Sequence, residues 1–155
     1  MRFNSLRFNI PTIAISALLF ATVAKADLVP FKDYQVSQSV WDVTMVKVHP
    51  NMLDAYLQGI KKTWVASSKI EKQLGQIEDY KIYESALPGS GDFNLMLAVE
   101  FKNDAALAPN EARYDAFMKA WGAKRNAETT QIAQKEYPAM RKITGEYLLR
   151  EITMK

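Results

Sequence analysis

The sequence predicts one α+β domain with the order strand, helix, strand, strand, helix, strand. β-branched and apolar residues dominate residues 40–48, and period-two alternation extends over residues 93–101, as in strands. Apolar residues recur every three or four positions over residues 50–74 and 111–136, which is typical of amphipathic helices. The Pro- and Gly-rich segment 88–92 is a short turn, so the strands on either side of it form a hairpin.

The expected strands cover residues 40–48, 77–86, 93–101 and 143–154. His49-Pro50-Asn51 ends the first strand, because proline cannot continue a central strand. In the third strand one face is wholly apolar and the other carries Asn94, Met96, Ala98 and Glu100. Gly145 is expected near the start of the last strand.

Both expected helices carry an apolar stripe. Gly75 is the expected left-handed stop of the first helix, and Pro138 the expected end of the second. The second stripe weakens after Arg125, which indicates a bend or a separate turn in the remainder. The stripes consist of Leu53, Tyr56, Leu57, Ile60 and Trp64 in the first helix, and Tyr114, Phe117, Met118 and Trp121 in the second.

Residues 1–26 have the three parts of a secretion signal. Arg2 and Arg7 precede an apolar stretch over residues 10–24, and Ala24-Lys25-Ala26 is a small-x-small cleavage site. The stretch is shorter than the roughly 20 residues that span a bilayer. We therefore expect cleavage after Ala26, a periplasmic or secreted protein, and no stable membrane insertion afterwards. The alternatives are an uncleaved anchor or a buried N-terminal helix.

Charge and composition exclude several function classes. Residues 1–26 hold three of the 20 basic residues and none of the 17 acidic residues, so the remainder carries 17 of each. A neutral domain gives no reason to expect nucleic acid or an anionic membrane as partner. The absence of cysteine excludes disulfides, thiolate catalysis and cysteine-bound metals. Residues 27–39 are a polar lead-in that we interpret as an arm.

The order of elements is the ferredoxin-like βαββαβ order. The strand at residues 40–48 with its proline turn, the hairpin from residues 79–83 to 95–101, and the ending at residues 140–152 resemble the dimeric α+β barrel superfamily over residues 40–155. The nearest resemblance is to its small uncharacterised exported members. It implies a four-stranded antiparallel sheet with two helices on one face, a homodimer, and a ligand between sheet and helices. The superfamily includes cofactor-independent monooxygenases, cyclases, isomerases and haem proteins.

The sheet face opposite the helices is expected to pair with a second copy. We place Met96, Ala98 and Thr44 on it, and such a face is too apolar to remain in water. A two-fold contact between two sheets would bury it.

The aromatic residues of the stripes are the candidate ligand-binding residues. Tyrosine and tryptophan carry polar groups that need partners when buried, so these residues fit either a core or a cavity for a flat apolar ligand. They are Tyr56, Trp64, Tyr114, Phe117 and Trp121.

Asp42, Glu100 and Arg150 are weak catalytic candidates, because they and Asn94 are polar residues within apolar strands. A buried carboxylate with a raised pKa could act as a general base. The alternative is a salt bridge between Glu100 and Arg150 at the dimer interface.

His49 is the only histidine, and we expect it to be an exposed turn residue. With no second histidine and no cysteine, the sequence predicts no metal site and no cofactor. A catalytic triad would also require His49, and no nucleophile-elbow motif accompanies it.

These observations favour an exported homodimeric domain that binds a small apolar or aromatic molecule. One alternative is a cofactor-independent monooxygenase, cyclase or isomerase. The other is a structural or interaction module.

Overall fold

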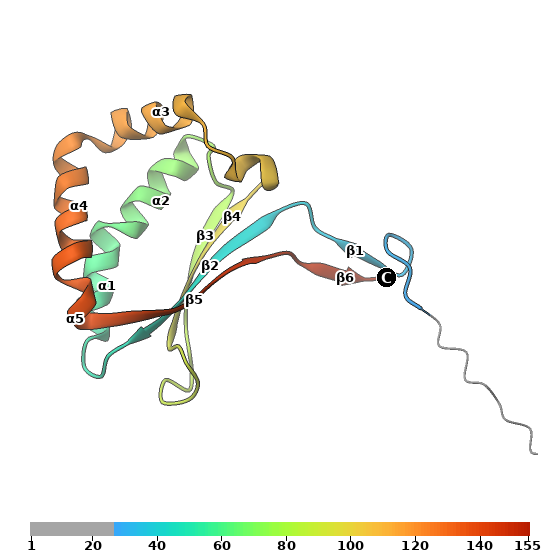
Figure 1. Ribbon diagram of the computed structural model, residues 1–155, viewed down its shortest axis with the longest axis horizontal. Coiled ribbons are helices and arrows are strands. Elements are labelled where there is room, and N and C mark those ends of the chain that lie inside the picture. The colour runs from blue at the N-terminus through green and yellow to red at the C-terminus, as the bar shows by residue number, and fades with distance from the viewer. Residues whose placement is uncertain (1–26) are drawn as a thin grey trace, which may run out of the picture.

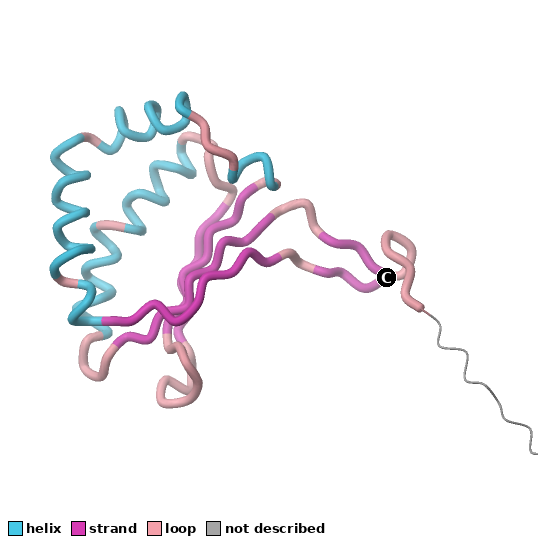
Figure 2. The backbone as a smooth tube through the Cα atoms, viewed as in Figure 1, coloured by secondary structure: helices cyan, strands magenta, loops and turns pink. Residues whose placement is uncertain are grey.

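The computed structural model describes residues 27–155, and the predicted signal peptide lies outside the described residues. The fold is α+β, with a four-stranded antiparallel sheet in the order β3-β4-β2-β5 and helices covering one face (Figures 1 and 2). The strands of the sheet are β2 (Val40–Val48), β3 (Asp79–Glu84), β4 (Leu95–Phe101) and β5 (Arg141–Leu149). The helices are α1 (Leu53–Lys62), α2 (Trp64–Gln73), the 3-10 turn η1 (Asp104–Leu107), α3 (Glu111–Trp121), α4 (Ala123–Lys135) and α5 (Tyr137–Met140).

The predicted topology and the bounds of β2 are confirmed. β4 starts at Leu95, two residues later than predicted, and the Asn94 side chain, just before it, extends the contact with β2. Its Oδ1 accepts from the Val48 amide at 2.7 Å and its Nδ2 donates to the Val48 carbonyl at 2.9 Å. The predicted strand over residues 77–86 is shorter, at Asp79–Glu84.

The first predicted helix is two helices, which meet at Thr63. The Thr63 backbone leaves helical geometry at φ −106° and ψ −90°. Its hydroxyl contacts the hydroxyl of Tyr137 at 2.5 Å, so a distant part of the chain holds the break. Gly75, with φ +67°, follows the end of α2 as predicted.

The second predicted helix is also divided. Gly122 separates α3 from α4 with φ +85°, a conformation that L side chains rarely adopt. Pro138 does not end a helix as predicted but lies in the first turn of α5. The backbone N–H groups of a first turn have no partner within the helix, so proline, which lacks an N–H, is tolerated there.

The last predicted strand is two strands. β5 ends at Leu149, and β6 (Ile152–Met154) pairs with β1 (Tyr34–Val36) as a separate ribbon. The predicted arm thus contains a strand, and the ribbon extends away from the sheet and helices (Figure 1). Gly145 lies within β5, beside an irregularity in the pairing with Met45 and Val46.

The core lies between the sheet and the helices. We call this side of the sheet the helix face and the other side the open face. Thr44 belongs to the helix face, not the open face as predicted, because it shares its strand parity with Val46 and Val48 of the core. The buried cluster consists of Val46, Val48, Tyr56, Ile60, Leu95, Leu97 and Tyr137.

Candidate functional site

A pocket of about 180 Å³ lies between the helix face and the helices, and we call it the sheet–helix pocket. Side chains of the strands that point to the helix face form one wall of the pocket. The apolar stripe of α1 and the start of α2 form the other wall. The residues that line it are Thr44, Val46, Tyr56, Ile60, Trp64, Leu97, Tyr137, Arg141, Ile143 and Glu146.

Tyr56 and Tyr137 form the buried aromatic wall of this pocket. Their rings meet edge to face with centroids 5.1 Å apart. Tyr137 packs directly on α1, where a Cβ at Gly59 would lie 2.9 Å from the tyrosine ring. Burial raises the pKa of both tyrosines, and the positive charge of Arg141 acts in the opposite direction on each. Both hydroxyls are therefore protonated at neutral pH, and the hydroxyl of Tyr137 is already engaged by that of Thr63.

Trp64 is the second aromatic wall residue. It is half-buried at the first position of α2, and its ring meets Tyr80 of β3 edge to face at 5.7 Å. Because the helix is interrupted at Thr63, Trp64 begins a new helix beside the pocket. The predicted candidates Tyr56 and Trp64 therefore share one site.

The other three aromatic candidates lie outside the lining of this pocket. Phe117 and Trp121 stack on each other at 5.8 Å, and Arg125 lies over the Trp121 ring at 5.0 Å. Trp121 is buried, whereas Tyr114 is 63% exposed. A ligand-binding role for these three stays a prediction.

Arg141 is the cation of the sheet–helix pocket. It is the first residue of β5, and its guanidinium lies 5.5 Å from the Tyr137 ring centroid and 6.0 Å from that of Tyr56. Its Nε is buried and has no hydrogen-bond partner among the described residues. Arg141 and Tyr137 are not among the predicted site residues, because the last strand begins two residues earlier than predicted and a short helix follows where Pro138 was expected to end one.

Two carboxylates lie on the helix face of neighbouring strands. Asp42 is paired with Leu148 and Thr44 with Glu146, so Asp42 and Glu146 are diagonal neighbours. Partial desolvation raises the pKa of Asp42, and the negative charge of Glu146 raises it further. Glu146 lines the pocket, and both side chains are exposed in the single chain. The pair is a candidate proton acceptor at the rim of the pocket.

Glu100 and Arg150, the other two catalytic candidates, form no ion pair with each other within the described chain. Arg150 pairs instead with Asp104, and it donates to the carbonyls of Ser37 at 3.1 Å and Gln38 at 2.9 Å. Arg150 thereby fastens the base of the β1–β6 ribbon. Glu100 lies on the open face of β4 opposite Trp41, away from the sheet–helix pocket.

His49 is exposed in the turn after β2, as expected. Within residues 27–155 no group of three His, Asp or Glu side chains is placed to hold a metal ion. In the same residues, no helix is long and apolar enough to cross a bilayer.

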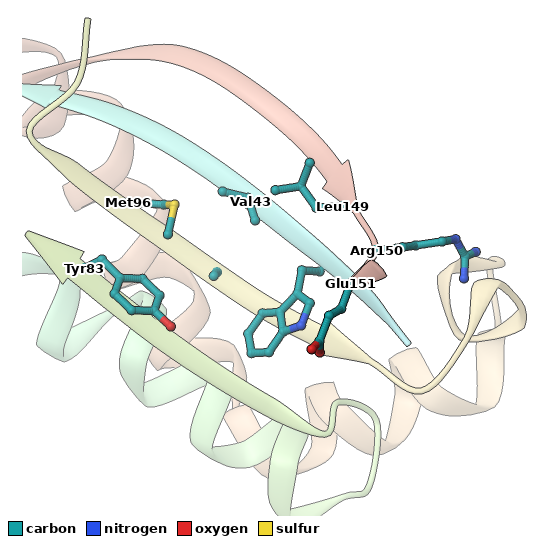
Figure 3. Close-up of a pocket in the computed structure, with 8 residues that line it drawn as sticks. Val43, Tyr83, Met96, Leu149, Arg150 and Glu151 are labelled. Carbon is teal, nitrogen blue, oxygen red and sulfur yellow. The ribbon is translucent and has the colours of Figure 1, made fainter. Parts of the chain in front are cut away.

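The open face carries a second, shallower hollow of about 280 Å³. Figure 3 shows Val43, Met96 and Leu149 on three adjacent strands, with Tyr83 on the edge strand β3. Arg150 and Glu151 lie at its end, next to the base of the ribbon (Figure 3). The remaining lining residues are Trp41 and Ala98.

Comparison with known proteins identifies relatives in structure. No protein-family model and no curated protein matches the sequence. Among solved structures, HapK from Hahella chejuensis covers 72% of this chain and 91% of its own, with 12% identity and a TM-score of 0.44.

Two further structures are similar to the same extent. A dimeric ferredoxin-like protein from an uncultured marine organism covers 77% of this chain and 90% of its own, with 8% identity and a TM-score of 0.42. A Bacteroides thetaiotaomicron protein of unknown function, described as a possible oxidoreductase, covers 77% and 99%, with 16% identity and a TM-score of 0.40. These likenesses concern the fold alone. By its strand order and pairing the chain has the predicted ferredoxin-like α+β fold.

Proposed function

We propose that this protein binds a small molecule with an apolar or aromatic body in the sheet–helix pocket. The observation that carries the proposal is the lining itself: three aromatic and four aliphatic side chains surround the hollow, together with the polar side chains of Thr44, Arg141 and Glu146. Ligand pockets are typically apolar with a small number of placed polar groups. The three aromatic residues are Tyr56, Trp64 and Tyr137.

Titration with neutral single-ring compounds tests this proposal. We expect saturable binding of benzyl alcohol or benzamide, observed by calorimetry and by amide chemical shifts of α1 and β2. Thr44→Phe adds a ring to the pocket from β2 and should abolish binding. Met45→Phe is the matched control, since it adds the same ring to the opposite face of the same strand. Absence of binding in the wild type would favour a structural or interaction module.

The second candidate function is a cofactor-independent enzyme acting on a ligand in this pocket. Glu146 at the rim, beside Asp42, favours it because a carboxylate near a bound ligand can accept a proton. Incubation of bound compounds with the protein, followed by mass spectrometry, should then reveal a product. Glu146→Gln should retain binding and lose turnover, whereas unchanged compounds with the wild type would contradict the enzyme.

We further propose that the protein acts as a homodimer in which the open faces meet. Large apolar side chains of this face remain in contact with water in the single chain: Tyr83 is 48% exposed, Tyr147 50% and Leu149 46%. A continuous apolar face of this kind marks an interaction site. Two copies related by a two-fold axis would cover each other's hollow.

The β1–β6 ribbon also supports a second copy of the chain on the open face. Ile152 and Met154 of β6 are 60% and 61% exposed, and Phe31 in the turn before β1 is 77% exposed. An isolated pair of strands is marginal in water. Because the ribbon projects beyond the sheet, a second copy on the open face would be within its reach (Figure 1).

We also propose that the protein is exported and that its signal peptide is cleaved. This proposal rests on the three-part pattern of residues 1–26. N-terminal sequencing of the protein from the extracytoplasmic fraction should begin at Asp27. A retained Met1 in the membrane fraction would contradict cleavage.

A further inference from the structure

We propose that the sheet–helix pocket selects small aromatic carboxylates, with the carboxylate held by Arg141. This inference rests on the proposed ligand-binding function and names the chemical class of the ligand. It follows from Arg141, a cation without an ion-pair partner among the described residues, at one end of a pocket lined mainly by aromatic and aliphatic side chains.

Arg141 has no carboxylate partner among the described residues. The two ion pairs within residues 27–155 are Lys72–Asp79 and Arg150–Asp104. Arg141 is half-buried, and its Nε is fully buried without an acceptor in the described chain. A buried charged donor without an acceptor is costly, so an anion that enters this pocket gains a charge-assisted hydrogen bond.

The surroundings of Arg141 hold it in place without neutralising it. The rings of Tyr56 and Tyr137 lie within cation–π distance of the guanidinium. These aromatic contacts leave the positive charge present. A guanidinium presents a planar fork of N–H donors that matches the two oxygens of a carboxylate.

The remainder of the pocket fits the ring of such a ligand. Val46, Ile60, Leu97 and Trp64 provide apolar contacts. The volume of about 180 Å³ is smaller than the roughly 300–1,000 Å³ of pockets for drug-sized ligands. One aromatic ring with one acidic group is therefore the appropriate size.

Glu146 determines which end receives the carboxylate. In the register of the sheet Arg141 is opposite Val48 and Glu146 is opposite Thr44, so their backbone positions are four residues of β2 apart, or about 13 Å along the strand. A carboxylate is attracted at the Arg141 end and repelled at the Glu146 end. The two ends of the pocket therefore differ in charge, and this difference orients a charged ligand but not a neutral one.

Calorimetric titration with benzoate and with its neutral isostere benzamide, both at pH 7, tests the inference. We expect benzoate to bind at least about tenfold more tightly than benzamide, since a charge-assisted bond contributes about 1.5–3 kcal/mol. Arg141→Met should abolish this preference, because it weakens benzoate binding far more than benzamide binding. Arg141→Lys should retain part of it, and Glu146→Gln should leave benzoate binding equal or tighter.

A control variant and the two compounds together distinguish failure of the carboxylate inference from failure of the ligand-binding proposal. Arg150→Met removes an arginine outside the pocket and should preserve the preference. Equal binding of benzoate and benzamide would overturn the carboxylate inference while the ligand-binding proposal stands. Binding of neither compound would overturn both. If Arg141→Met does not fold, as judged by urea unfolding, the benzoate-to-benzamide ratio in the wild type and in Arg141→Lys decides.

Discussion

Both faces of the sheet carry apolar side chains, but the helices cover only one of them, and its β5 edge at Leu148 stays 62% exposed. On the helix face Val46 and Leu95 are each 1% exposed. On the open face Tyr83 and Tyr147 are about half exposed. A sheet with one wet face normally alternates apolar and polar residues, so two apolar faces indicate that both are buried in the functional state. The helices bury one face within the chain, and burial of the other requires another molecule.

The largest expected effect is loss of the aromatic core on the helix face. Tyr56→Ala should lower the free energy of unfolding by about 3–5 kcal/mol, because Tyr56 is 2% exposed and packs against Tyr137. Tyr83→Ala removes the same side chain from the open face and should cost below about 1 kcal/mol in the monomer. Urea unfolding at a concentration where light scattering gives the monomer mass measures both. Equal losses would contradict the distinction between the faces.

Two tryptophans sharpen the comparison within the helix layer. Trp121→Ala should cost about 3–5 kcal/mol of stability and leave binding of benzamide unchanged, because Trp121 is buried against Phe117 outside the pocket. Trp64→Ala should cost less stability and weaken binding, because Trp64 is half-buried and lines the pocket. Urea unfolding and calorimetric titration of both variants measure this. The reverse pattern would move the binding site to α3.

The open face is tested by a charge at its centre. Met96→Glu should raise the dimer dissociation constant about 100-fold, equivalent to about 3 kcal/mol for a buried unpaired charge. Gln58→Glu on the exposed side of α1 is the matched control and should leave the dimer intact. Light scattering over a dilution series measures the dissociation constant. A wild type that is monomeric at micromolar concentration would contradict the dimer.

The smallest expected effect concerns pH. The pKa of Asp42 is raised in the folded state, so between the unfolded value near 3.8 and the raised value the folded state binds more protons than the unfolded state. Asp42 therefore lowers stability as pH rises through that window, and the loss persists above it. Asp42→Asn should stabilise the protein by below about 0.5 kcal/mol at pH 7 and have no such effect at pH 3. Urea midpoints at both pH values measure this, and a loss of stability at pH 7 would contradict it.

The sequence predicted two of the three aromatic residues that line the pocket, and it missed Tyr137 and Arg141 for an identifiable reason. Tyr56 and Trp64 belong to the stripe that starts at Leu53, and a local period of three and four was enough to select them. Tyr137 and Arg141 lie where a short helix ends and β5 begins, and no periodic pattern covers such a junction. The Gly122 break carried a signal, since a glycine within a helical pattern marks a conformation that other residues avoid.

The sequence by itself determined the order of the elements, the bounds of β2 and the apolar character of both sheet faces, because these depend on local periods and on turn residues. Only the tertiary structure decided where the first helix breaks and which cation enters the pocket. Thr63 breaks the helix where it contacts Tyr137, and Arg141 reaches the pocket because β5 pairs with β2 in a register that sets it beside Val48. Such contacts join residues far apart in the chain, so their cause lies in packing and in strand register rather than in any local pattern.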